Sequence, residues 1–193
     1  CKAGYEPMKS RGFTLIELLV VLAIAAILAM MAAPSFKRIL QSGAMSSNVN
    51  TFLTDMRFAR SEAIRYGGNV VMCRSDDPEG ASPVCDAGAG PGNNGWVSGW
   101  IIFHDLDADT VIDAGEQILR IQAPITNINS IVETTPNIYR FTATGRLLAV
   151  AGGGESQLSF GSSPTFDTSV RRVVCVGLSG RARVAGDGST SCP

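Results

Sequence analysis

The stretch Gly12-Phe13-Thr14-Leu15-Ile16-Glu17 separates a short basic segment from the most apolar part of the chain. Met8-Lys9-Ser10-Arg11 precedes it, and an apolar run covers residues 13–33, interrupted by the acid Glu17 and followed by Pro34. A helix over that run would be roughly 31 Å long, about the thickness of the hydrocarbon core of a bilayer. Length and composition therefore predict a helix that crosses a membrane once.

Two simpler interpretations account for less of this stretch. A secretory signal peptide also has a basic start and an apolar middle, but its apolar region is shorter, and here Pro34 would directly follow the small residues at the cleavage site. A plain transmembrane anchor leaves Glu17 unexplained, because a lone acid inside a membrane is costly and usually has a partner.

The sequence from Gly12 to Leu18 resembles the class III leader of type IV prepilins and type II secretion pseudopilins. The resemblance implies cleavage by prepilin peptidase after Gly12 on the cytoplasmic side and N-methylation of Phe13. Cleavage creates a cationic amine at Phe13, which Glu17 can neutralise within its own chain or in a neighbouring subunit. Glu17 and Pro34 are thus expected assembly residues. The expected partners are other pilins or pseudopilins, the peptidase and methylase, and the inner membrane, with the C-terminal domain periplasmic.

The pattern beyond Pro34 predicts an α+β fold. Apolar residues recur at spacings of three and four, which is typical of an amphipathic helix, and the pair at 67–68 is Gly-Gly, which ends helices. Short β-like runs broken by Gly, Pro, Asn and Asp follow. We expect a cleaved leader at 1–12, a transmembrane and assembly helix at 13–33, its amphipathic continuation at 34–66 and an exported antiparallel β-domain at 67–193. The expected strands are 70–73, 96–103, 117–121, 138–142, 157–160, 173–176 and 181–184.

Three short motifs narrow the resemblance. Residues 60–65 (RSEAIR), 100–103 (WIIF) and 113–116 (DAGE) are similar to the GspH/FimT group of minor pilins and pseudopilins. The resemblance implies a structural subunit of a type IV pilus or, alternatively, a GspH-like pseudopilin of a type II secretion system.

Four cysteines, Cys73, Cys85, Cys175 and Cys192, follow the predicted cleavage site. An even number in an exported domain predicts two disulfides, for which three pairings exist. We favour Cys73–Cys85 and Cys175–Cys192, since each closes a short loop and the second would hold the C-terminus. Zinc is the alternative, but there is no C-x-x-C spacing and only one histidine, so no cofactor is expected.

Acidic residues cluster between two predicted strands. They occupy positions 1, 3, 5, 9 and 12 of an EF-hand-like loop and are Asp105, Asp107, Asp109, Asp113 and Glu116. Thr110 stands where such a loop needs glycine, and the flanking segments are predicted strands. A hairpin turn rich in aspartate explains the same residues, so calcium is the weaker interpretation.

Gly180-Arg181-Ala182-Arg183 is the strongest candidate for a binding site. If 181–184 is a strand, Arg181 and Arg183 point to one face, roughly 6.6 Å apart, close to the phosphate repeat of an extended nucleic-acid strand. Arginine binds phosphate with two parallel hydrogen bonds, and Arg171 and Arg172 could widen the patch. The pattern also resembles the GRxR motif of FimT-type pilins linked to DNA uptake in natural transformation, which implies double-stranded DNA as a partner. Solvated arginines on an edge strand are the alternative.

Composition gives little support for other classes of function. The formal net charge is −1, which is unlike a general nucleic-acid binder, although residues 74–116 contain nine acids and one base. The lone histidine, His104, lies in a predicted strand, and the sequence has no nucleophile elbow or phosphate-binding loop. We therefore expect no enzymatic activity.

Overall fold

The computed structural model describes residues 13–133, 138–148, 155–162, 164–186 and 189–192, with backbone only at 32–34. Two compact units make up the chain: one ends at Ile39 and the other begins at Leu40. The predicted leader, including Gly12, lies outside the described residues, as does the side chain of Pro34.

Helix α1 extends from Leu15 to Tyr66, so the predicted helical continuation beyond Pro34 is confirmed. Its C-terminal end is closed by Gly67 at φ 82° and by a hydrogen bond of 2.7 Å from Gly68 N to Ala63 O. Among the described residues, no single helix has both the length and the apolar composition of a membrane span. Two parts of α1, Leu15–Met31 and Ser35–Tyr66, meet these two criteria when they are taken as a pair.

The first unit presents apolar side chains on every side of the helix. All the large apolar residues between Phe13 and Ile39 that the structure describes are exposed, among them Leu15 at 81 % and Ile27 at 61 %. A helix that is apolar all round needs apolar surroundings, which lipid or other helices provide.

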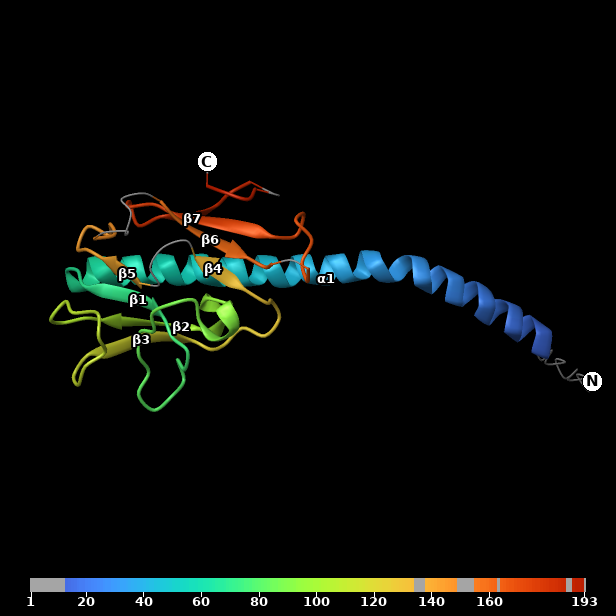
Figure 1. Cartoon of the computed structure of the whole chain (residues 1–193), viewed down its shortest axis with the longest axis horizontal. Helices are drawn as coiled ribbons and strands as arrows, with labels where there is room; N and C mark the ends of the chain where they lie inside the picture. Colours follow the sequence, from blue (N-terminus) through green and yellow to red (C-terminus); the bar gives the residue numbers. More distant parts are fainter. Residues whose placement is uncertain (1–12, 134–137, 149–154, 163, 187–188, 193) are drawn as a thin grey trace, which may run out of the picture. The chain divides into compact units, whose positions relative to one another are not determined.

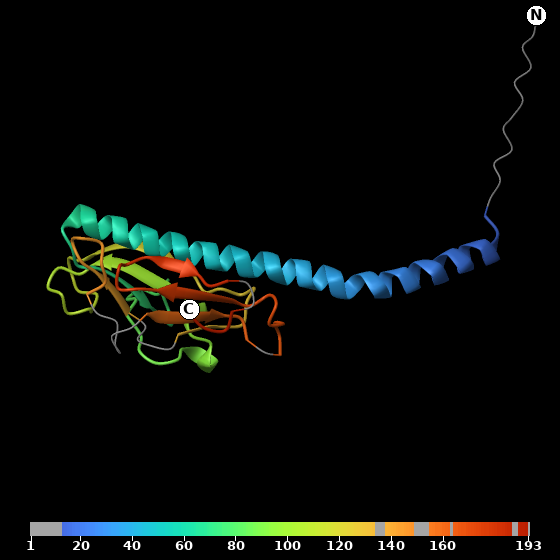
Figure 2. The ribbon, with the colours of Figure 1, turned by 90° about the horizontal axis from the view of Figure 1, so that it is seen from above.

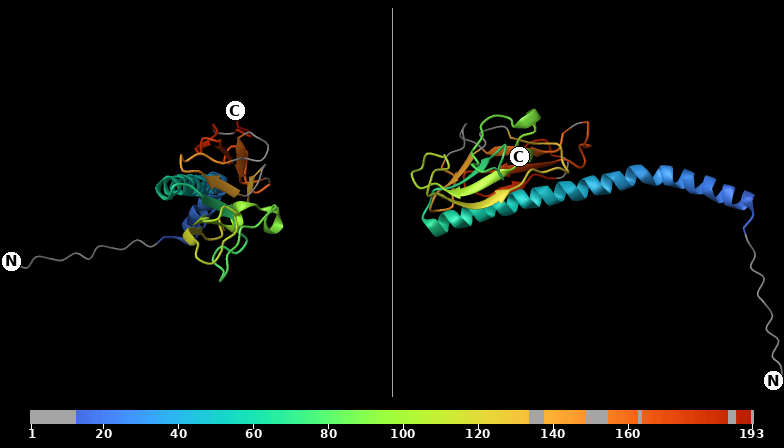
Figure 3. Two further views of the ribbon diagram at one scale, coloured as in Figure 1. Left: turned by 90° about the vertical axis from the view of Figure 1, so that its left-hand side faces the viewer. Right: turned by 90° about the horizontal axis from the view of Figure 1, so that it is seen from below.

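The second unit contains two antiparallel sheets of four strands each. The first sheet has the order β3-β2-β1-β5 and the second the order β4-β6-β7-β8. The strands are β1 (Val70–Arg74), β2 (Trp100–His104), β3 (Gln117–Gln122), β4 (Ile131–Glu133), β5 (Ile138–Phe141), β6 (Ser156–Phe160), β7 (Arg172–Val176) and β8 (Ala182–Val184). In Figure 1, β1–β3 lie on one side of α1 and β6 and β7 on the other. Figures 2 and 3 show both sheets on the same flank of the helix, which closes the open side between them. The α+β fold with a helix packed on a small antiparallel β-domain is confirmed.

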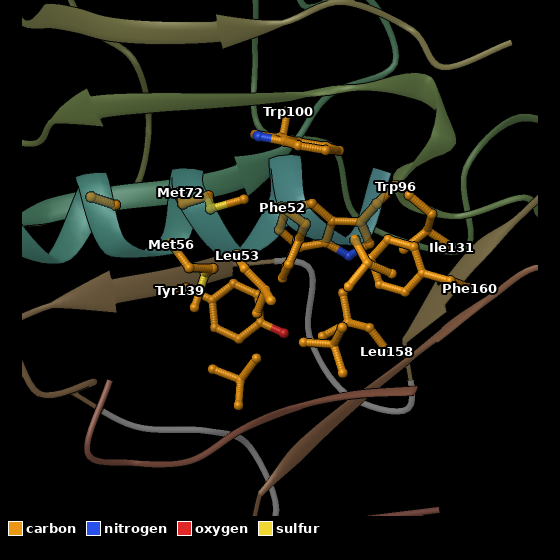
Figure 4. Close-up of a cluster of buried hydrophobic side chains, with 14 of the residues drawn as sticks. Phe52, Leu53, Met56, Met72, Trp96, Trp100, Ile131, Tyr139, Leu158 and Phe160 are labelled. Atoms are coloured by element: carbon orange, nitrogen blue, oxygen red, sulfur yellow. The ribbon is translucent and has the colours of Figure 1, made fainter. Parts of the chain in front are cut away.

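Phe52 of α1 lies at the centre of the core between the sheets (Figure 4). Its ring makes edge contacts with Trp96, Trp100 and Phe160 at centroid distances of 5.6, 5.5 and 5.9 Å. Every residue of the core clusters lies at Ala44 or later. A fragment that begins at Leu40 therefore retains the complete core and can be studied without the apolar unit.

Two details differ from the sequence prediction. The expected strand 96–103 is divided: Trp96–Ser98 form the 3₁₀ helix η2, Gly99 adopts φ 113°, and β2 begins at Trp100. Gly99 is required there because a Cβ would lie 2.5 Å from Gln122 O. Strand β4 was not expected, since three residues give too little alternation to detect.

Candidate functional site

The start of α1 carries the residues expected to direct cleavage and assembly. Thr14 caps the helix, because its Oγ1 accepts a hydrogen bond of 3.3 Å from Glu17 N, and Leu18 N donates to Thr14 O at 3.1 Å. Glu17 is the only acid in the first turn and is exposed on the apolar helix. The T-x-x-E spacing is a capping-box sequence, which the sequence analysis overlooked. The cap gives the helix a defined beginning at Leu15, the third residue after the expected cleavage site.

Both expected disulfides are present. Cys73 of β1 is bonded to Cys85, and Cys175 of β7 to Cys192, with Cα–Cα distances of 5.4 and 5.8 Å. The Glu155 carboxylate lies beside the second bond. Because both of these cysteines are oxidised, neither offers zinc a thiolate. The second disulfide attaches the C-terminal segment to the outer face of its sheet.

The acidic cluster forms the loop between β2 and β3, so strands flank it, as the turn interpretation predicts. Carboxylate oxygens of Asp105, Asp107 and Asp109 lie within 4.8 Å of one another. Asp105 is fully buried, and its oxygens accept hydrogen bonds from the backbone N–H groups of Ala108 at 2.7 Å, Asp109 at 3.2 Å and Thr110 at 3.1 Å. Its carboxylate is therefore used to shape the turn.

Two further acids of this loop, Glu116 and Asp109, also accept hydrogen bonds from backbone N–H groups. Glu116 accepts hydrogen bonds from Leu106 N at 2.6 Å and Asp113 N at 3.1 Å. Loss of hydration and the nearby carboxylate of Asp109 raise the pKa of Asp107. Arg140 adds a cation 3.4 Å from Asp105. The loop is thus held by hydrogen bonds between carboxylates and backbone N–H groups and by one arginine. Asp113 and Glu116 do not belong to the close group formed by the carboxylates of Asp105, Asp107 and Asp109.

The C-terminal arginines contact different groups in the fold. Strand β8 begins at Ala182, one residue later than expected, so only Arg183 belongs to it. The Arg183 Nη2 group donates to both carboxylate oxygens of Glu155, at 2.9 and 3.1 Å. Arg181 instead lines a hollow with Arg57 and Arg60 of α1. Arg181 and Arg183 therefore have different partners, although they lie only two residues apart.

Arg171 and Arg172 lie at the opposite end of β7 from the turn that leads to Arg181. The two ends of β7 are five residues apart, which corresponds to roughly 16 Å along the strand. Arg171 Nε donates to Phe166 O at 3.1 Å, and Arg172 Nη1 donates to Ser169 O at 3.0 Å. Both side chains are thus held at a separate position and do not widen the patch at Arg181.

A half-buried carboxylate that the sequence analysis did not single out joins the two sheets. Glu133 of β4 accepts hydrogen bonds from Trp96 Nε1 at 2.9 Å, from Tyr139 Oη and from Ser156 Oγ. Burial raises the pKa of Glu133 to about 7, although the three donors oppose the shift. Sequence gives no signal for this group, because its three partners come from three separate elements, η2, β5 and β6.

Two family models match this chain, one over most of its length and one over its N-terminal segment. The family model described as "Type II transport protein GspH" matches residues 48–180, which is most of the chain. The chain belongs to the GspH family. The "Prokaryotic N-terminal methylation motif" matches residues 7–33 of this GspH-family chain, and these include the Gly12-Phe13 junction and Glu17.

One curated relative extends the comparison. "Prepilin peptidase-dependent protein D" of Escherichia coli (strain K12) is 38 % identical over 60 residues, which cover 31 % of this GspH-family chain and 41 % of that protein. The chain thus spans less than half the length of this relative. No solved structure matches the chain. The GspH domain and the N-terminal methylation motif together place this chain among the minor pilins and pseudopilins.

Proposed function

We propose that this chain is a minor pilin of a type IV pilus that binds double-stranded DNA through its C-terminal arginines during natural transformation. The observation that carries the filament role is the combination of the methylation motif at residues 7–33 with a GspH domain at 48–180. The chain is cut after Gly12, methylated at Phe13 and packed into the filament by its apolar helix.

Glu17 sets the register of packing in this proposal. Its carboxylate is the single acid of residues 15–39, the part of α1 whose surroundings must be apolar, so it needs a cationic partner there. The amine that cleavage creates at Phe13, in its own chain or in the neighbouring subunit, supplies that charge. The Thr14 cap places Glu17 in the first helical turn, where the helix dipole also favours a negative charge.

Exchange of Glu17 tests this role in cells. We expect Glu17→Gln to be cleaved and inserted normally but to be depleted from sheared filaments, whereas Glu17→Asp, which keeps the charge, retains incorporation in part. Immunoblots of sheared and membrane fractions measure incorporation, and mass spectrometry of the N-terminus measures cleavage and methylation. Normal incorporation of Glu17→Gln would contradict the charge pairing.

DNA binding rests on Arg181 and on the GRxR pattern. Arg181 is exposed and has a neighbouring hollow lined by two further arginines, which favours contact with an anion. Backbone contacts of this kind are tolerant of sequence and weaken with salt. We expect Arg181→Gln with Arg183→Gln to abolish duplex binding and transformation while piliation persists. Fluorescence polarisation with the fragment 40–193 measures binding, and an unchanged melting temperature shows that the double variant is folded.

A GspH-like pseudopilin of a type II secretion system without DNA binding is the second candidate. The description of the matching family, "Type II transport protein GspH", favours it. Failure of the wild-type fragment to bind duplex DNA, together with loss of protein secretion in a deletion strain, would select this alternative.

A further inference from the structure

We infer that Arg57 and Arg60 of helix α1 complete, with Arg181, a site for a backbone phosphate of nucleic acid; this inference rests on the DNA-binding function proposed above. The three arginines line one hollow of about 290 Å³, together with Gly180 and Ala182. In Figure 2 the short red arrow of β8 lies beside the C-terminal half of α1, which is where the hollow is found.

These three side chains differ from five other arginines of the domain in their partners. Arg65, Arg120 and Arg183 each form an ion pair with a carboxylate, as do Arg74 and Arg140. Within the part of the chain that the structure describes, Arg57, Arg60 and Arg181 have no carboxylate at salt-bridge distance. Three positive charges therefore converge without neutralisation, and an anion is the ligand that relieves their repulsion.

Close packing fixes the position of the arginines. A Cβ on Gly180, which has φ 72°, would lie 2.1 Å from Gly145 O, so the turn before β8 rests directly on the turn at 142–146. A Cβ on Gly145 would in turn lie 2.8 Å from Arg60 Nε and 3.0 Å from Arg60 Cγ. Two glycines thus bring the helix and the β8 turn close together, and the stem of Arg60 packs on Gly145.

The geometry favours a phosphate group as the ligand. Arg57 and Arg60 are three residues apart on one helix face, where Cβ atoms are about 5–6 Å apart. Arg57 and Arg181 are exposed and Arg60 is half-buried, so an anion reaches the hollow from solvent. Guanidinium groups bind phosphate with paired hydrogen bonds, and the rigid helix holds two of the three groups in place. Arg183 forms an ion pair with Glu155 and does not line this hollow.

The test compares the wild type with arginine variants of the fragment 40–193 in duplex titrations at two salt concentrations. We expect Arg57→Gln with Arg60→Gln to weaken binding about tenfold or more, and to lower the salt slope by about 1 for each phosphate that the variant no longer binds. Arg65→Gln is the control, because it removes a charge from the same helix at a residue paired with Glu62 and outside the hollow. Its affinity and slope should change by less than about twofold.

A second variant tests the geometry without altering charge. Gly180→Ala places a Cβ against Gly145 O and must shift the β8 turn, so it should weaken duplex binding while the net charge is unchanged. Melting temperatures show whether each variant is folded. If Gly180→Ala does not fold, the arginine variants alone test the inference. If the wild type binds duplex DNA and Arg57→Gln/Arg60→Gln binds it with the same affinity and salt slope, this inference is wrong while the proposed DNA function stands. No duplex binding by the wild type, or binding only to phosphatidylglycerol vesicles, would overturn the proposed DNA function as well.

Discussion

Raising the pH from about 4.5 to 7 should destabilise the β-domain, because Glu133 stays protonated in the fold at pH values where it ionises in the unfolded chain. Its pKa is raised to about 7 from an ordinary value of 4.5. A group with a raised pKa in the fold contributes stability below its unfolded pKa and loses that contribution as the pH rises through its folded pKa. The window for this protein is therefore about pH 4.5 to 7.

The magnitude follows from the difference between the two pKa values. One pKa unit corresponds to about 1.4 kcal/mol, so Glu133 should account for a loss of about 3 kcal/mol in the free energy of unfolding between pH 4.5 and 8. Burial of the carboxylate is the cause, and the donors Trp96, Tyr139 and Ser156 limit its size.

Glu133→Gln isolates this contribution. The amide has the shape of the protonated acid, and its oxygen can accept from Trp96 Nε1 while its NH₂ group donates to the hydroxyls of Tyr139 and Ser156, which can also accept. The variant should therefore keep the network but lose the titration. Glu79→Gln, at an exposed loop position, is the matched control with the same change in charge.

Urea unfolding of the fragment 40–193 across the pH range, with disulfides intact, measures the effect. The wild type and Glu79→Gln should show the extra loss of stability, and Glu133→Gln should not. Emission from Trp96 gives a second measurement, since its indole donates to the titrating group, and it should change near pH 7 in the wild type only. Parallel pH dependence in the wild type and Glu133→Gln would refute the reasoning.

Three further outcomes concern stability. Phe52→Ala should lower the free energy of unfolding by about 3–5 kcal/mol, because it leaves a cavity among four aromatic rings; a loss below about 1 kcal/mol in urea titrations would contradict the packing. Replacing Cys175 and Cys192 together by serine should cost about 2–4 kcal/mol and increase proteolysis of the C-terminal segment, and unchanged proteolysis would argue against the tether. Asp105→Ala should destabilise the β2–β3 loop by about 2–4 kcal/mol, since three backbone donors and Arg140 lose their acceptor, and hydrogen exchange confined to 106–116 would identify the loop.

The sequence by itself was sufficient for the features that depend on neighbours along the chain. The apolar run with one acid, the helical spacing up to Ile64 and the Gly-Gly stop gave a helix that the structure bears out. The even number of cysteines and their short separations gave the pairings Cys73–Cys85 and Cys175–Cys192, which are present. Periodicity, caps and loop lengths are local properties, so they can be read without knowing the fold.

Tertiary structure alone decided which charges meet. The spacing of Arg181 and Arg183 suggested one patch, yet Arg183 pairs with Glu155, while Arg181 lies with Arg57 and Arg60, more than a hundred residues earlier in the chain. Glu133 likewise has a raised pKa because the fold removes it from water, and only the fold brings its donors Trp96, Tyr139 and Ser156 to it. The pKa of a side chain and the ligand that it can bind depend on its burial and on partners distant in sequence. Both are set only when the two sheets pack against α1.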